Sequence, residues 1–109
     1  MADDTATVQS LKDGIRRFAA ARGWEPYHTP KNLVLALASE VGELCDLVRW
    51  MTPDESVKAP GDPALREAMA DELADVANIV FLLGSHAGID LADAIAAKMR
   101  KNEQKYPAP

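Results

Sequence analysis

The chain has 109 residues and a formal net charge of −5, from 17 acidic and 12 basic residues. This length allows one domain and excludes a multidomain enzyme, and the acid excess argues against nucleic-acid binding, which needs a basic surface. Apolar residues make up 48% of the chain but aromatic residues only 6%. That balance favours packed helices over a β-sandwich.

Features that would indicate export or a membrane location are missing from the sequence. Cys45 is the only cysteine, which excludes an intrachain disulfide and a cysteine-rich zinc site. The first seven residues include two aspartates and no apolar stretch, so we expect no signal peptide. No run approaches the roughly 18 apolar residues of a membrane-spanning helix. We therefore predict a cytoplasmic protein that does not bind membranes.

The spacing of apolar side chains predicts four helices and no strand. Thr29 and Asp90 are predicted caps, Gly23 and Gly88 follow helix ends, and residues 53–61, rich in proline and glycine, form the one long connection. We expect a single domain over residues 1–109 with flexible ends at 1–7 and 107–109. The predicted helices cover residues 8–22, 30–51, 63–86 and 91–104.

Acidic residues interrupt the apolar stripes of the second and third predicted helices. Glu40 lies within one stripe and Glu43 at its edge, while Glu72 and Asp75 lie at the margin of the other. A spacing of three residues puts both members of each pair on one helix face. Buried like charges are unfavourable unless something compensates for them, and Mg²⁺ or Mn²⁺ prefers carboxylate oxygens. The pattern therefore predicts a metal site formed by four carboxylates.

Three alternative roles for these acids stay open. Each acid alone would ordinarily be a solvated surface side chain, but two pairs in matching register favour the metal site. A di-iron or di-manganese redox bundle places Glu-x-x-His on two helices, and neither pair here has that histidine. A non-catalytic helical oligomerisation module would need no paired acids.

Several short motifs lie along the chain: E-V-G-E-L at 40–44, E-L-A-D-V at 72–76, Lys98 with Asn102, and K-Y-P at 105–107. With these motifs the chain resembles the MazG-like all-α nucleoside triphosphate pyrophosphohydrolases. Within that superfamily, the segment from Phe18 to Asn32, with Arg-Gly-Trp-Glu and Tyr-His, and Trp50 are most similar to the dCTP pyrophosphatases. The resemblance covers about residues 11–107.

This resemblance implies an enzyme that cleaves a nucleoside triphosphate, dCTP or a modified dCTP, to monophosphate and pyrophosphate and so cleanses the nucleotide pool. It implies Mg²⁺, with Mn²⁺ as a substitute, and a catalytic role for its four ligands, Glu40, Glu43, Glu72 and Asp75. The substrate-binding positions that it implies are Trp24, Glu25, Tyr27, His28, Trp50, Ile79, Lys98 and Asn102. By themselves, the two tryptophans would be accounted for equally well by packing.

Three positions differ from the pattern of the dCTP pyrophosphatases. Ile79 stands where dCTP-specific members often have a tyrosine, Asn78 where they often have an apolar residue, and Ile15 where some have a histidine. These differences bear on which nucleotide is preferred rather than on the hydrolytic chemistry.

A four-helix unit of this length and aromatic content buries only a modest core. We therefore expect a four-helix MazG-like bundle whose core is completed by self-association, and the resemblance implies a dimer or tetramer with sites completed across subunits.

Overall fold

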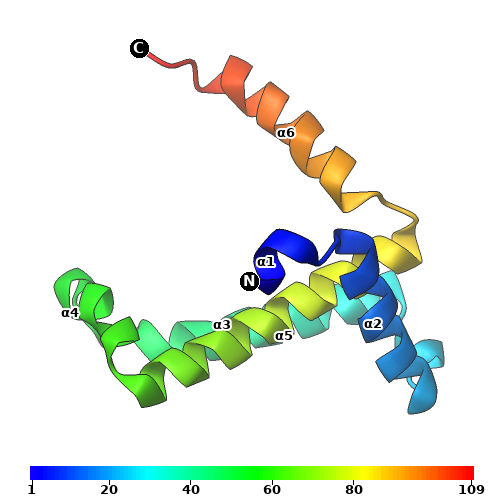
Figure 1. Ribbon diagram of the computed structural model, residues 1–109, viewed down its shortest axis with the longest axis horizontal. Helices are drawn as coiled ribbons and strands as arrows, with labels where there is room; N and C mark the ends of the chain where they lie inside the picture. Colours follow the sequence, from blue (N-terminus) through cyan, green and yellow to red (C-terminus); the bar gives the residue numbers. More distant parts are fainter.

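The protein is described by a computed structural model that covers residues 1–109 and contains six α-helices, two short 3-10 turns and no strand. Two long helices, α3 (Pro30–Val48) and α5 (Pro63–Ala87), run antiparallel side by side at the centre (Figure 1). Helix α2 packs across the C-terminal half of α5. The predicted all-α class is confirmed. The remaining elements are α1 (Ala2–Thr5), α2 (Val8–Ala21), η1 (Glu25–Tyr27), α4 (Pro53–Lys58), η2 (Ala59–Gly61) and α6 (Leu91–Lys105).

Side-chain caps set the ends of the main helices where the sequence predicts them. The Thr29 hydroxyl accepts a hydrogen bond from the backbone N–H of Asn32 at 3.2 Å, and a carboxylate oxygen of Asp90 accepts one from the N–H of Asp93 at 2.9 Å. Gly23 and Gly88 have φ of 67° and 68°, a left-handed conformation that glycine adopts without steric cost. These local signals place α2, α3, α5 and α6 within a few residues of the predicted bounds.

Residues 53–61 connect α3 to α5 as predicted, but they form a short helix and a 3-10 turn that were not predicted from the sequence. Thr52 and Glu55 form a capping box, in which each side chain accepts a hydrogen bond from the backbone N–H of the other residue. Pro53 occupies the first helical position, where its missing N–H is harmless. The short helix α4 and turn η2 thus join α3 to α5.

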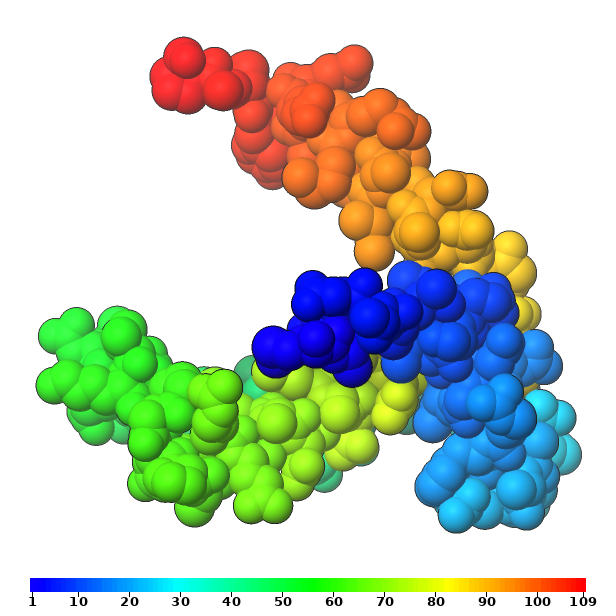
Figure 2. Space-filling view, in the orientation of Figure 1, coloured from blue at the N-terminus to red at the C-terminus, as the bar shows by residue number.

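The fourth predicted helix forms but does not join a four-helix bundle within this chain. The axes of α5 and α6 differ by 99°, and α6 extends away from the α3–α5 pair (Figures 1 and 2). The radius of gyration is 16.5 Å, compared with about 13 Å for a compact chain of this length. Only six of the 109 residues are buried. No single helix is long and apolar enough to cross a membrane.

The corner between α5 and α6 is held by close contacts. A Cβ atom on Gly84 would lie 3.0 Å from Cγ of Leu91, so the helices approach where a side chain is missing. Lys12 is only 7% exposed, and its ammonium group donates a hydrogen bond to the carbonyl oxygen of Ile89 at 2.8 Å. Helix α2 therefore stabilises the turn between α5 and α6, and this turn sets the direction of α6.

Candidate active site and metal centre

Carboxylates from the two central helices converge. Glu40 and Glu43 of α3 and Glu72 of α5 each place a carboxylate oxygen within 4.8 Å of the others. The spacing of three puts the two α3 acids on one face, and the antiparallel packing of α5 brings Glu72 opposite them. Asp75 lies one turn further along α5, outside this group of three. Its negative charge still contributes to raising the pKa of Glu40 and of Glu72.

The cluster concentrates negative charge that no basic side chain of the chain neutralises. Burial, and then the neighbouring charge of Glu43, raises the pKa of Glu40 from 4.5 to about 7. Burial, followed by the charge of Glu43, also raises the pKa of Glu72. None of the four acids forms an ion pair with lysine or arginine. Glu40 and Glu72 are therefore easier to protonate than solvated carboxyls.

The donor set fits a hard divalent cation. Glu40 and Glu72 each have one buried carboxyl oxygen, Oε2, without a hydrogen-bond partner, and buried polar atoms normally have one. A divalent ion would supply the missing partner, and oxygen-only ligands suit Mg²⁺ or Mn²⁺ rather than zinc. Neither histidine belongs to the cluster.

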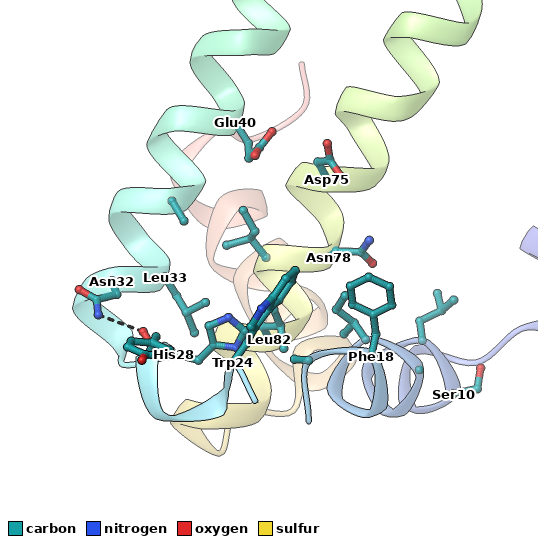
Figure 3. A pocket seen from close by; sticks show the side chains of 17 residues that line it. Ser10, Phe18, Trp24, His28, Asn32, Leu33, Glu40, Asp75, Asn78 and Leu82 are labelled. Carbon is teal, nitrogen blue, oxygen red and sulfur yellow. Dashed lines mark hydrogen bonds between the residues drawn. The ribbon is translucent and has the colours of Figure 1, made fainter. Parts of the chain in front are cut away.

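A cavity of about 910 Å³ begins at the cluster and extends between α2, α3 and α5. Figure 3 shows Glu40 and Asp75 at one end, with Trp24, His28, Leu82 and Phe18 at the other. The cavity thus joins an anionic end to a largely apolar end. Its other lining residues are Ser10, Leu11, Gly14, Ile15, Ala19, Tyr27, Asn32, Leu33, Ala36, Asn78 and Ile79.

Aromatic rings form the apolar end of the cavity. Trp24 meets Phe18 edge to face with ring centroids 5.7 Å apart and meets His28 in the same way at 6.4 Å. His86 lies behind His28, with centroids 6.0 Å apart. Such rings offer flat apolar surfaces on which a planar heterocycle can stack. His28 also keeps a buried Nδ1 without a partner.

The loop that carries Trp24 and His28 is anchored at both sides. Gly23 turns the chain out of α2 with its positive φ, and the amide nitrogen of Asn32 donates to the carbonyl oxygen of Tyr27 at 2.9 Å. Between these two anchors, residues 25–27 form the 3-10 turn η1. Sequence patterns did not predict that α2 would form one cavity wall, since no local signal reveals that long-range packing.

The expected binding residues divide into two groups. Trp24, Tyr27, His28 and Ile79 line the cavity. The others do not line the cavity within this chain. Glu25 lies 3.8 Å from Arg16, Trp50 is 83% exposed beyond the end of α3, and Lys98 and Asn102 lie on the projecting helix α6.

Comparisons with known proteins agree with this architecture. The chain is 39% identical to dCTP pyrophosphatase 1 of Mus musculus over 101 residues, which are 93% of this chain and 59% of that protein. It is also 39% identical to dCTP pyrophosphatase 1 of Homo sapiens over 102 residues, 94% of this chain and 60% of that protein. The chain thus spans about three fifths of the length of these curated relatives.

A solved structure is similar over nearly the whole chain. The crystal structure of a pyrophosphatase from Archaeoglobus fulgidus matches with a TM-score of 0.85 and 37% identity, covering 92% of each chain. Residues 35–109, which include the three clustered acids and Asp75, match the MazG-like family. The chain therefore belongs to the MazG-like family.

Proposed function

We propose that this protein hydrolyses a nucleoside triphosphate, dCTP or a modified dCTP, to the monophosphate and pyrophosphate. The observation that carries the proposal is the shared cavity: Glu40 and Asp75 line the same space as Trp24 and His28. A nucleotide whose base lies among the aromatic rings would therefore direct its phosphates to the carboxylates. The names of the curated relatives, dCTP pyrophosphatase 1, support the choice of substrate.

In this proposal, the four acids hold Mg²⁺, for which Mn²⁺ can substitute. The bound ion supplies the positive charge that offsets negative charge developing on the pyrophosphate leaving group. Glu40 and Glu43 are the two candidates to orient the attacking water and accept its proton. Because the cluster is anionic, the protein binds a triphosphate poorly without the ion.

Two other functions are less well supported. A passive oligomerisation module would not need three carboxylates gathered within 4.8 Å or an aromatic-lined cavity beside them. A di-metal redox centre of the ferritin-like type uses histidine ligands, and here His28 lies at the opposite end of the cavity from Glu40 (Figure 3).

Cleansing of the nucleotide pool would place the protein in the cytoplasm, where its substrates are found.

The test is a panel of nucleoside triphosphates incubated with the protein, with and without Mg²⁺, and analysed for monophosphate and pyrophosphate. We expect Mg²⁺-dependent release of both products, fastest with dCTP or a modified dCTP. Glu72→Gln should abolish release, while Asp71→Asn, the same charge change at the exposed neighbouring residue, should not. Full activity of Glu72→Gln would contradict the metal assignment, and no product from any nucleotide would refute the hydrolase.

We also propose that the protein self-associates as a dimer or tetramer. Helix α6 exposes Ile95 by 62% and Met99 by 55%, one turn apart on one face, and the chain buries little core of its own. Lys98 and Asn102 are carried on this helix, away from the cavity of their own chain. A second copy would cover the apolar face and bring these polar residues to a neighbouring site.

Light scattering after gel filtration measures the assembly. Mixing provides a sharper test, because Glu72→Gln and Lys98→Ala disable different parts of a shared site. If Lys98 acts across the interface, co-refolded mixtures of the two inactive variants should recover part of the activity. A monomer with full activity, or mixtures without recovery, would contradict the shared site.

A further inference from the structure

Asn78 has a side-chain amide without a hydrogen-bond partner, in a cavity whose lining is mostly apolar. It lies in the middle of α5, one turn after Asp75, and is partly buried. Figure 3 shows it between Asp75 and Phe18, along the length of the cavity. Asparagine is a poorer helix former than the leucine or alanine found elsewhere in this helix. Helix propensity therefore does not explain why an asparagine occupies this position of α5.

Two other neutral polar side chains of the cavity already have partners. The amide of Asn32 donates to the carbonyl oxygen of Tyr27, and the hydroxyl of Ser10 donates to the carbonyl oxygen of Thr7 at 2.7 Å. His28 keeps a buried Nδ1 without a partner, but it lies at the aromatic end of the cavity. The carboxamide of Asn78 makes no hydrogen bond within the chain, and it offers both a donor and an acceptor. A ligand that fills the cavity and displaces water from this amide would become its partner.

Its position along α5 indicates which part of a nucleotide it meets. At a rise of about 1.5 Å per residue, Asn78 lies about 4.5 Å beyond Asp75, and Leu82 about 10.5 Å beyond it. In a nucleotide the sugar adjoins the α-phosphate, and the base lies beyond the sugar. If the phosphates meet the carboxylates, the sugar reaches the level of Asn78, and the base reaches the rings around Leu82.

We propose that Asn78 determines sugar specificity by hydrogen-bonding the 3′-hydroxyl of the pentose, which is the hydroxyl that a 2′-deoxynucleotide keeps. This inference rests on the proposed function, because it uses the phosphates to fix the position of the sugar. A site that pairs its polar group with a substrate hydroxyl discriminates against analogues lacking it, since the protein group is then left unpaired. An apolar side chain at this position would not distinguish such sugars strongly.

The test compares cytidine triphosphates that differ only in their hydroxyl groups: the ribonucleotide and its 2′-deoxy, 3′-deoxy and 2′,3′-dideoxy forms. For the wild-type protein, loss of the contacted hydroxyl should lower kcat/KM tenfold or more. Asn78→Leu, of similar size, should lower kcat/KM by a similar factor only for nucleotides that carry this hydroxyl. Loss of the 2′-hydroxyl alone should not lower kcat/KM, and a loss of activity that follows the 2′-hydroxyl instead would overturn the proposal.

Ile79→Ala is the matched control, because it removes a neighbouring cavity contact that forms no hydrogen bond. It should lower kcat/KM by one common factor for all four nucleotides. If Asn78→Leu also lowered all four equally, or left all four unchanged, the proposal would be overturned.

A binding measurement separates this inference from the proposed function. Dissociation constants for the four nucleotides come from quenching of tryptophan fluorescence, since Trp24 lines the cavity, with Ca²⁺ replacing Mg²⁺ to slow hydrolysis. A hydroxyl-dependent effect of Asn78→Leu on binding would support the inference even if the wild-type protein proved inactive. A protein that neither hydrolysed nor bound any of the four would refute both.

Discussion

Replacing Glu40 by glutamine should stabilise the metal-free protein at neutral pH while removing its response to Mg²⁺. In the folded chain the pKa of Glu40 is raised to about 7 by burial and by the charge of Glu43, compared with 4.5 for the solvated group. At pH 8 the wild-type cluster is therefore largely charged and unfavourable in the absence of metal. Glutamine removes one of these charges but keeps the size and polarity of the side chain.

The shifted pKa also fixes the direction of the pH dependence. Between pH 4.5 and about 7 the folded chain holds a proton on Glu40 that the unfolded chain has released. The free energy of unfolding of the metal-free protein therefore falls as pH rises through this window and levels off above it. The raised pKa of Glu72 acts in the same direction. Mg²⁺ at 100 times its dissociation constant should restore about 2.7 kcal/mol at pH 8.

Urea denaturation followed by circular dichroism measures these effects at pH 5, 6, 7 and 8, in EDTA and in Mg²⁺. In EDTA, Glu40→Gln should make the free energy of unfolding depend less on pH, and it should lose most of the stabilisation that Mg²⁺ gives the wild type. Asp71→Asn, which is exposed and outside the cluster, should behave like wild type. A metal-free stability that rises between pH 5 and 7, or an equal gain from Mg²⁺ in Glu40→Gln, would refute the reasoning.

Three more predictions concern the corner, the cavity and the metal. Gly84→Ala should lower the melting temperature, because the new Cβ would lie 3.0 Å from Leu91. In a protein that already carries Leu91→Ala, the same substitution should instead stabilise the fold by about 1 kcal/mol through helix propensity. Gly14→Ala is the control, because a Cβ there would have nothing within 4 Å. Trp24→Leu should lower kcat/KM ten- to a hundredfold by removing a stacking surface worth about 1–3 kcal/mol, while the fold measured by circular dichroism stays helical. EDTA should abolish pyrophosphate release, and Mg²⁺ or Mn²⁺ should restore it.

Helix positions could be predicted because their signals are local. Asp62 followed by proline marks the start of α5, and Gly88 in its left-handed conformation marks the end. Helix α4 is the exception. Proline and glycine at residues 53–61 are typical of a connection, but Thr52 and Glu55 have the spacing of a capping box and Pro53 occupies the first position of a helix.

The carboxylate cluster could also be predicted, since helical periodicity fixes which residues share a face. Glu40, Glu43 and Glu72 meet as that pattern indicates, with Asp75 close by. The cavity wall formed by α2 could not be predicted in this way. Phe18 meets Trp24 across the Gly23 turn at the end of α2. The packing of α2 against α5, which places these rings beside the cavity, depends on contacts between residues far apart in the sequence.

The direction of α6 keeps Lys98 and Asn102 away from the cavity of their own chain, although the sequence predicts the helix itself. Periodicity predicts a helix at residues 91–104, but its angle to α5 depends on the missing side chain at Gly84 and on the bond from Lys12 to Ile89. Those contacts hold α6 away from its own cavity, with Ile95 and Met99 exposed. An apolar helix face held in solvent is unfavourable unless something covers it. A second copy would cover that face and supply Lys98, so assembly and catalysis would depend on the same helix.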